Sequence, residues 1–422
     1  MRQARLQVVE SLGEVDAAAW DALARPAGVL LGHRFLRALE TTGCVGDGTG
    51  WAPRHLLLWD EGGGVTRRSG TDTGSDVDVG IDAGDSDGRD DGHDGASARL
   101  IGAAPLYLKS HSYGEYVFDW AWADAYERHG LRYYPKWLCA VPFTPVGGAR
   151  LLAAGGEARA ALAQALVALA GESGLSSLHV LFPPEAEARL LADAGCMLRT
   201  GTQFHWRNAG WRDFDGFLAG LSQPKRKKIR AERRKVREAG ASVRVLAGAD
   251  IRPEHWRFFH ACYRNTYSEH LSTPYLNLAF FETLGAQLAE HCVMALAEDA
   301  EGPMAASLLL RDHTADGGHR LYGRYWGALR TVPCLHFELA YYAPIEWAIA
   351  HGVDVIEGGA QGEHKLARGF LPVATRSAHW LAHPAFADAV QDFLRREAAG
   401  VDTYLDELSE HTPFRRAGSS AS

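Results

Sequence analysis

Long apolar runs and paired cysteines are missing from the sequence, and each absence excludes a class of protein. No run of about 18 apolar residues occurs, so we expect no membrane-spanning helix. The first sixteen residues lack the apolar segment of a secretion signal. The six cysteines form no Cys-x-x-Cys pair and are expected to be reduced, mostly buried thiols. We therefore expect a cytoplasmic protein with no disulfide framework and no metal site, and we expect it to be a monomer.

What remains is the composition of a globular chain with room for two domains. Of its 422 residues, 46% are hydrophobic and 23% are charged. Residues 60–98 hold eleven acidic and three basic residues, a balance of -8 that equals the net charge of the whole chain. Segment 61–98 is rich in Gly, Asp and Ser, so we expect a disordered acidic insert between strands at 54–59 and 99–109. Its Asp-Gly pairs leave calcium binding open, although their spacing is irregular.

Residues 225–237 concentrate the opposite charge, with nine basic residues and one acid. The pattern predicts a helix over 222–239 that starts at Ser222 and stops at Gly240, with only Ile229 and Val236 as apolar anchors. A helix this polar packs poorly, which favours an anionic partner such as tRNA or a diphosphate. A solvated helix balanced by the acidic insert is the alternative. The candidate anion-binding residues are Lys225, Arg226, Lys228, Arg230 and Arg233.

Two stretches about two hundred residues apart, 103–123 and 305–328, share an order of strand, polar turn and aromatic strand. This weak duplication predicts two copies of one α/β unit, at 1–205 and 206–400, followed by a C-terminal tail at 401–422. In the second copy we expect helices at 253–268 and 277–290, then three antiparallel strands within 292–328. A helix at 335–352, kinked or restarted at Pro344, precedes strands at 353–359 and 375–383. That order is the order of N-acetyltransferase-like (GNAT) domains.

Several longer motifs resemble the FemAB-like branch of the GNAT superfamily, a branch associated with peptidoglycan biosynthesis or recognition. They are "SYGEYVFDWAWADAYERHGLRYYPKW", "AVPFTPVGGARLL", "LYGRYWGA", "LHFELAYY", "GAQGEHKLARGF" and "SAHWL". The resemblance covers nearly the whole chain except the acidic insert. It implies an α/β (α+β) fold of tandem GNAT-like domains, with mixed central sheets flanked by helices. Better understood relatives transfer an aminoacyl group from charged tRNA to an amine of a cell-wall precursor.

The glycine-rich segment 357–370 follows a predicted buried strand and ends in a cluster of charges. Glycines let backbone N–H groups approach a ligand, and Lys365 and Arg368 could hold an anion or a developing oxyanion. The resemblance places Lys365 near the reacting carbonyl. Glu363 and His364 are the candidate bases; a His-Glu-x-x-His zinc motif is absent. The alternative is a plain turn with a solvated tip. The expected donor-binding residues here are Gly358, Gly359, Gln361 and Gly362.

The strand "LYGRYWGA" (321–328) carries the other donor candidates. Strict alternation would place Tyr322, Arg324 and Trp326 on one face and Gly323, Tyr325 and Gly327 on the other. The resemblance implies that the acyl arm of the donor lies along this strand, and an aromatic core strand is the alternative. The following loop, "LRTVPCLHFE", has no glycine, so a CoA pyrophosphate would lack its usual cradle. The donor-binding residues expected from this strand are Tyr322, Arg324, Tyr325, Trp326 and Gly327.

In the first half, aromatic side chains surround a few acids and one lysine. Rings stack on apolar faces of sugars while acids bind hydroxyls or amines, which suits a sugar or peptide acceptor. Core packing would explain the rings alone. The candidate acceptor-binding residues are Glu115, Asp119, Trp120, Tyr126, Tyr134 and Lys136.

Together these patterns predict an N-acyltransferase that moves an acyl or aminoacyl group to an amine, which the resemblance suggests belongs to a cell-wall precursor. No tightly bound cofactor is expected, because the donor, aminoacyl-tRNA or acyl-CoA, would be a co-substrate. Two alternatives stay open: an ordinary acyl-CoA-dependent N-acetyltransferase, and a non-catalytic protein that binds RNA or a precursor.

Overall fold

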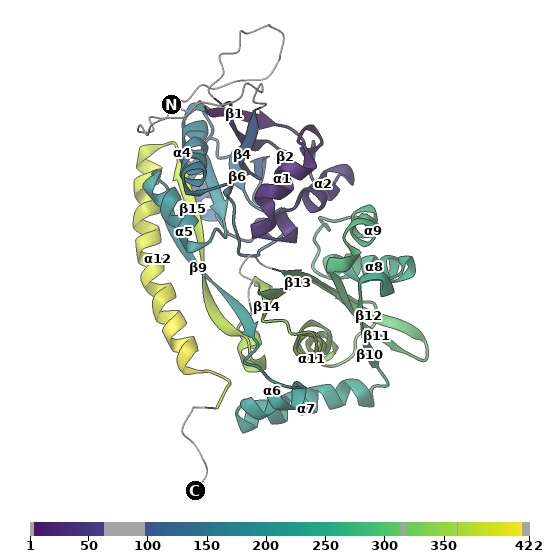
Figure 1. The fold of residues 1–422 in the computed structure, drawn as a ribbon. Helices are drawn as coiled ribbons and strands as arrows, with labels where there is room; N and C mark the ends of the chain where they lie inside the picture. Colours follow the sequence, from purple (N-terminus) through teal and green to yellow (C-terminus); the bar gives the residue numbers. More distant parts are fainter. Residues whose placement is uncertain (1–3, 63–97, 314–317, 361, 416–422) are drawn as a thin grey trace, which may run out of the picture. The chain divides into compact units, whose positions relative to one another are not determined.

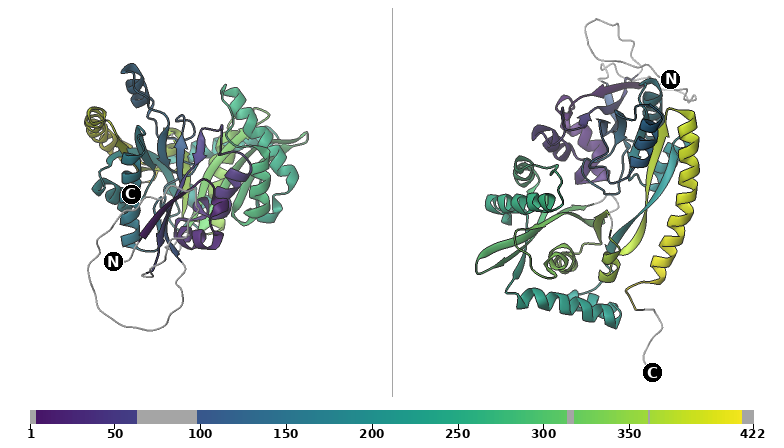
Figure 2. Two further views of the ribbon diagram at one scale, coloured as in Figure 1. Left: turned by 90° about the horizontal axis from the view of Figure 1, so that it is seen from above. Right: turned by 180° about the vertical axis from the view of Figure 1, so that it is seen from behind.

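The computed structural model describes residues 4–62, 98–313, 318–360 and 362–415 (Figure 1). The acidic insert therefore lies outside the described residues except at its ends. The chain forms two compact units, each built from several segments. Unit 1 consists of Met1–Pro142, Gly147–Arg199 and Arg376–Leu394, and unit 2 of Phe143–Val146, Thr200–Thr375 and Arg395–Ser422. The long helix α12 (Pro384–Glu410, yellow in Figure 2) contributes residues to both units.

Unit 1 combines an antiparallel four-stranded sheet with a second set of strands. The sheet has the order β1 (Ala4–Val9), β3 (His55–Asp60), β4 (Arg99–Ala104) and β7 (Leu152–Ala153). The second set has the order β2 (Trp51–Pro53), β5 (Leu106–Lys109), β6 (Lys136–Cys139), β8 (Ser177–Leu181) and the end of β15 (Leu371–Leu381). The expected strand at 54–59 is confirmed, and the one at 99–109 is divided into β4 and β5. The helices are α1 (Ala17–Ala24), α2 (His33–Thr41), α3 (Trp120–Arg128), α4 (Gly156–Glu172) and α5 (Glu185–Asp193).

Unit 2 has a six-strand order of β10, β11, β12, β13, β14 and β9. Of these strands only β13 and β14 pair in parallel. The strands span Ser242–Ala247 (β10), Cys292–Asp299 (β11), Gly302–His313 (β12), His319–Ala328 (β13), Val355–Ala360 (β14) and Met197–Arg207 (β9). The helices that precede the hairpin strands are α6 (Phe214–Gly220), α7 (Gln223–Glu238), α8 (Pro253–Glu269) and α9 (Leu278–Gln287). The helices expected at 222–239, 253–268 and 277–290 and the three hairpin strands are confirmed, in the GNAT-like order.

Helices cover both faces of the unit 2 sheet, which Figure 1 shows between α8 and α11. Helix α8 packs so closely on β13 that a Cβ added at Gly327 would lie 2.2 Å from the Cys262 carbonyl oxygen. On the basic helix α7, Ile229 and Val236 are buried as expected, and Glu232 is buried with them. Ser222 occupies the N-cap position, but its side chain makes no capping hydrogen bond.

The predicted helix at 335–352 is interrupted by a widened turn. A short helix, α10 (Leu335–Phe337), leads into a π turn at Glu338–Tyr342, and α11 (Ala343–Ala350) follows. Pro344 lies in the first turn of α11, so the helix restarts there as the sequence suggested. Proline has no N–H, and its ring would clash with the carbonyl four residues back, that of Ala340. The extra residue of the π turn relieves this conflict, and such turns often occur at functional sites.

All six cysteines are free thiols, and all except the half-buried Cys334 are buried. Burial raises the pKa values of Cys139, Cys196, Cys262 and Cys292 to about 12. Within the described residues, we find no helix with the length and apolar character needed to span a bilayer.

Candidate functional site

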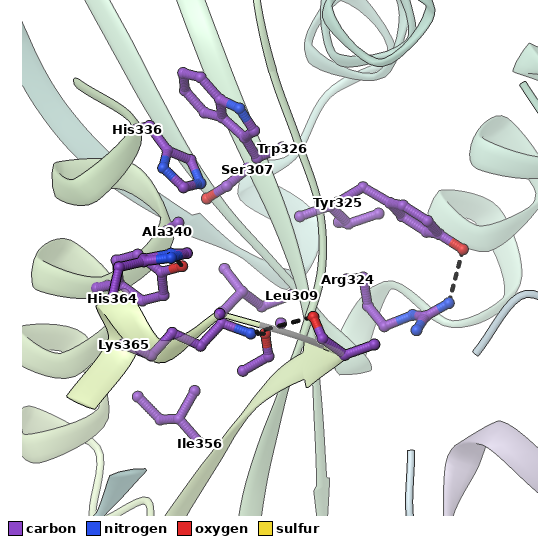
Figure 3. Close-up of a pocket in the computed structure, with 16 residues that line it drawn as sticks. Ser307, Leu309, Arg324, Tyr325, Trp326, His336, Ala340, Ile356, His364 and Lys365 are labelled. Carbon is purple, nitrogen blue, oxygen red and sulfur yellow. Dashed lines mark hydrogen bonds between the residues drawn. The ribbon is translucent and has the colours of Figure 1, made fainter. Parts of the chain in front are cut away.

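A cavity of about 460 Å³ lies in unit 2 where two neighbouring strands separate (Figure 3). Strands β13 and β14 pair over three residue pairs, the last of which is Tyr322 with Glu357. On its other side β13 shifts register against β12 at Leu308–Leu309, which leaves Arg324 as an extra residue. This bulge corrects the expected strict alternation, because a bulge re-aims the side chains around it. The cavity is lined by residues of β12, β13, β14, α10, the π turn and the turn at 362–365.

Glycine is required where the wall of the cavity is tightest. A Cβ at Gly358 would lie 3.1 Å from the Phe204 carbonyl oxygen and 3.2 Å from Cδ of Lys365. Gly362 has a φ of 117°, a backbone conformation that side chains disfavour. Gly358 and Gly362 thus allow Lys365 to lie against the end of β14.

Lys365 is the cation at the centre of this site. It lies on a 3-10 turn, Glu363–Arg368, and is only 4% exposed. Its Nζ donates to the carbonyl oxygens of Gly358 at 2.6 Å, Gly359 at 3.2 Å and Ala360 at 3.4 Å. Burial lowers its pKa to about 8. The Lys365 side chain therefore lies against the cavity, and its ammonium group loses a proton more readily than that of a free lysine.

His364 and Tyr341 form a hydrogen-bonded pair beside Lys365. His364 Nε2 and the Tyr341 hydroxyl lie 2.9 Å apart. Burial, with Arg368 and Lys365 nearby, lowers the pKa of His364, whereas burial raises the pKa of Tyr341 to about 12. At neutral pH the imidazole is therefore mostly uncharged, and its Nε2 can accept a hydrogen bond from the Tyr341 hydroxyl.

His336 also lines the cavity, with its ring centroid 5.0 Å from that of Trp326. Burial and the nearby His364, Arg368 and Lys365 lower its pKa to about 4. Among the described residues that line the cavity there is no aspartate or glutamate. Sequence reasoning did not select His336, Tyr341 or Ser307, since their convergence depends on the π turn and on strand pairing.

The other expected catalytic residues have different partners. Arg368 is 2% exposed, and its Nη2 lies 3.1 Å from each carboxylate oxygen of Glu232. Its guanidinium is therefore engaged by a carboxylate of α7, and it does not line the cavity. Glu363 accepts a hydrogen bond of 2.7 Å from the Tyr404 hydroxyl and is likewise absent from the lining.

The expected donor-binding residues divide into two groups. Arg324, Tyr325, Trp326, Gly358 and Gly362 line the cavity. Gly359 contributes a carbonyl to Lys365, Tyr322 is buried, Gly327 faces α8, and Gln361 lies outside the described residues.

Arg324, the extra residue of the bulge, is held in place by hydrogen bonds. Its Nη2 donates to the Phe143 carbonyl oxygen at 2.8 Å and to the Tyr325 hydroxyl at 2.7 Å. These contacts fix the guanidinium while leaving it part of the lining.

The expected acceptor-binding residues lie in unit 1. Lys136 Nζ donates to Ser112 Oγ at 2.8 Å and to Glu115 at 2.8 Å, and it also contacts Asp119. Burial raises the pKa of Glu115 to about 7; burial would raise that of Asp119 too, but Lys136 and His179 outweigh it and lower the pKa. The charges of this cluster compensate one another in the interior. Tyr134 bonds Ser112, Tyr126 joins an apolar cluster, and Trp120 is 38% exposed.

The expected anion-binding residues differ in their availability. Lys228 and Arg230 are exposed and Lys225 and Arg226 half-buried, although Arg230 lies 3.3 Å from Asp215. Arg233 forms ion pairs of 2.9 Å with Glu338 and 2.7 Å with Glu346. The exposed basic surface of α7 also includes Lys227, Arg234, Lys235 and Arg237.

Comparison with known proteins gives distant structural matches. The chain is similar to the C-terminal domain (DUF2156) of a proposed lysylphosphatidylglycerol synthetase from Agrobacterium fabrum, with 12% identity, a TM-score of 0.43, and coverage of 61% of this chain and 81% of that one. It is similar to L-PGS from Bacillus licheniformis, with 9% identity, a TM-score of 0.45, and coverage of 70% and 86%. A tandem GNAT protein from the clavulanic acid biosynthesis pathway matches at 12% identity and a TM-score of 0.42, with coverage of 90% and 99%.

No curated protein matches the chain. The model of the FemAB-like family, described as peptidoglycan biosynthesis/recognition, matches residues 11–416. The chain therefore belongs to the FemAB-like family.

Proposed function

We propose that the protein is an N-acyltransferase that moves an aminoacyl or acyl group onto the amine of a peptidoglycan precursor, within the cavity of unit 2. The observation that carries the proposal is the buried Lys365 ammonium, held by three backbone carbonyls at the point where β13 and β14 separate. The family description supports the class of acceptor.

In the proposed reaction the amine nitrogen attacks the carbonyl carbon of the donor ester. Negative charge develops on the carbonyl oxygen, and a preorganised cation in a site with little water stabilises such charge far more than water does. Lys365 is suited to this role, because its carbonyl partners fix the ammonium before the substrate arrives. The ester C–O bond then breaks, which leaves the new amide bond between donor and acceptor. The leaving oxygen takes up a proton to replace the one that the amine loses.

The attacking amine must lose a proton, and the Tyr341–His364 pair can accept it. The amine N–H would donate to the Tyr341 oxygen while the Tyr341 hydroxyl donates to the neutral His364. Because no described lining residue is an acid, a charged ammonium finds no counter-ion there. The amine is therefore expected to enter as its free base.

Aminoacyl-tRNA is the donor that we favour. The exposed basic residues of α7 suit a polyanion. The loop before α10 has no glycine, so it offers a CoA pyrophosphate a poor backbone cradle.

Ligand-induced thermal shift is the first test of this proposal. A ligand present at 100 times its Kd adds about 2.7 kcal/mol to the free energy of unfolding. We expect a shift with charged tRNA that high salt removes, and no shift with acyl-CoA. A shift with acyl-CoA alone would replace the proposed donor, and binding of tRNA without transfer to any amine would favour a binding protein.

Site variants then test the chemistry. Lys365→Met and Tyr341→Phe should lower turnover by about a hundredfold, the usual effect of losing one preorganised donor or one acid–base group. Glu363→Gln is the matched control, since Glu363 belongs to the same turn but bonds to Tyr404 and does not line the cavity. Equal activity of all three variants would contradict the assigned roles.

A further inference from the structure

The basic helix α7 has a single acid within its charged run, and that acid points inward. Glu232 is 8% exposed, whereas the basic residues on either side reach solvent. Both of its carboxylate oxygens lie 3.1 Å from Nη2 of Arg368, and the Tyr342 hydroxyl also donates to it. Glu232 is therefore a buried carboxylate with two hydrogen-bonding partners, and it links α7 to the interior of unit 2.

Arg368 also bonds to the turn that contributes His364 and Lys365 to the cavity lining. Its Nη1 donates to the carbonyl oxygen of His364 at 2.7 Å. Its guanidinium carbon lies 3.5 Å from the centroid of the Phe337 ring, next to the π turn. One side chain therefore joins α7, the end of α10 and the backbone of a cavity residue.

The turn itself has little intrinsic stiffness. It spans Glu363–Arg368 as a 3-10 helix, and 3-10 geometry is weakly held over such lengths. Glycines with φ of 117° (Gly362) and 90° (Gly369) flank it, and glycine restrains its own backbone less than any other residue. Its placement must come from contacts: the exposed Glu363 bonds to Tyr404 of α12, and Arg368 supplies the buried contact, to Glu232 of α7.

We infer that Glu232 and Arg368 are positioning residues, which fix the turn that carries His364 and Lys365 against the cavity. The inference rests on the proposed function only for what Lys365 does in the reaction; the placement of Lys365 can be measured without turnover. Neither positioning residue is expected to touch the substrate.

The test uses Arg368→Lys in the full chain. Lysine keeps the positive charge beside Glu232, so the field at Lys365 changes little, but it cannot reach Glu232 and the His364 carbonyl together. The readout is the pH dependence of Lys365 acetylation by acetic anhydride, followed by peptide mass spectrometry. Glu238→Gln, an exposed acid of the same helix that pairs with Arg234 at 3.5 Å, is the control.

We expect a labelling midpoint near pH 8 in the wild type and in Glu238→Gln. In Arg368→Lys the turn should loosen, Lys365 should gain water, and the midpoint should rise by about one pH unit or more. Where a donor supports turnover, kcat should fall roughly tenfold or more with little change in KM, as for a misplaced catalytic group. An unchanged midpoint in a folded Arg368→Lys protein overturns the inference.

A double variant covers the case in which Arg368→Lys does not fold. Glu232→Gln with Arg368→Met removes the buried ion pair as a unit, which proteins often tolerate, and the glutamine still accepts from Tyr342. The same rise of the midpoint is expected, and a wild-type midpoint contradicts positioning. A wild type that transfers no acyl group would overturn the proposed function, while the labelling result would still decide this inference.

Discussion

Lys365 is a residue at which stability and the proposed chemistry oppose each other. Burying its ammonium costs free energy of solvation. This cost lowers the pKa of Lys365 to about 8, compared with about 10.4 for a free lysine. Proteins keep such costs mainly at functional sites, where the group has work to do.

Lys365→Met is therefore expected to raise the free energy of unfolding at pH 7 by about 1–3 kcal/mol while lowering transfer about a hundredfold. The unfolded chain binds the lysine proton more tightly than the folded one, so wild-type stability rises as pH increases from about 8 to above 10. The difference in the free energy of unfolding between Lys365→Met and the wild type should therefore decrease over that pH range. Chemical denaturation of both proteins at pH 7 and pH 10 measures it, and a less stable variant at pH 7 would contradict the argument.

Arg368 shows what a local pattern cannot provide at the residue scale. The motif "HKLARGF" places Lys365 and Arg368 three residues apart, which suggested one shared anion. In the structure Lys365 lines the cavity, while Arg368 binds Glu232, 136 positions earlier in the chain. The partner of a buried charge is set by tertiary structure, so the spacing of residues within the motif cannot predict it.

At the scale of elements, the sequence predicted α8, α9 and the strands β11 to β14 from their apolar residues, and α7 from its start and stop residues, Ser222 and Gly240. Two irregularities escaped the pattern. The bulge at Arg324 depends on the register against β12, and Pro344 predicted an interruption of the helix but not its π geometry at Glu338–Tyr342. Both line the cavity, so the least regular elements form the candidate site.

The close packing of α8 on β13 gives a test at this scale. Gly327→Ala would place a methyl group 2.2 Å from the Cys262 carbonyl oxygen, and neither backbone can yield without moving α8. We expect a loss of roughly 3 kcal/mol in the free energy of unfolding, the upper range for overpacking. Gly400→Ala in α12, where the methyl group meets nothing within 4 Å, is the control and should gain about 0.5–1 kcal/mol. Equal effects in urea denaturation would show that α8 adapts.

The basic surface of α7 gives a second test. Lys227→Glu with Lys228→Glu changes two exposed residues of α7, and Arg128→Glu with Arg132→Glu makes the same charge change on unit 1. The α7 variant should bind charged tRNA at least tenfold more weakly, with a salt dependence of log K that is less steep by about 1.5. Filter binding between 50 and 200 mM salt compares the two, and equal losses would mean a nonspecific effect of net charge.

At the scale of the whole molecule, neither unit is one continuous stretch of chain. Unit 1 includes Arg376–Leu394, which supplies part of β15 and the start of α12. In its core His379 Nδ1 lies 2.7 Å from His179 Nδ1, and Leu381, Val390 and Leu394 join one apolar cluster.

A fragment of residues 1–205 therefore lacks part of its own core. We expect it to be insoluble or molten when produced alone, and to recover native near-ultraviolet circular dichroism when residues 206–422 are co-expressed with it. A cooperative thermal transition of the isolated fragment would show that Arg376–Leu394 is dispensable.

Acid sensitivity is a second property of the whole chain. Burial lowers the pKa of His205 and of His379 to about 3, so both stay neutral in the folded protein where the unfolded chain protonates them near pH 6.5. The unfolded state binds more protons between pH 6.5 and about 3, so stability falls as the pH drops through that window. At pH 5 each histidine should cost about 2 kcal/mol.

His379→Gln should flatten the decrease in stability between pH 7.5 and pH 5 by about 2 kcal/mol. His411→Gln, at an exposed position, is the control and should leave the decrease unchanged. Denaturant titrations at the two pH values provide the comparison, and parallel curves for all proteins would remove the buried histidine as the cause.

The distribution of the cysteines has a practical consequence. Five thiols are shielded by the fold, and Cys334 stands apart at the start of α10, two residues before His336 of the cavity. A maleimide fluorophore should therefore attach there first, with no engineered substitution. The native chain thus has a built-in reporter, whose emission could follow ligand entry in real time.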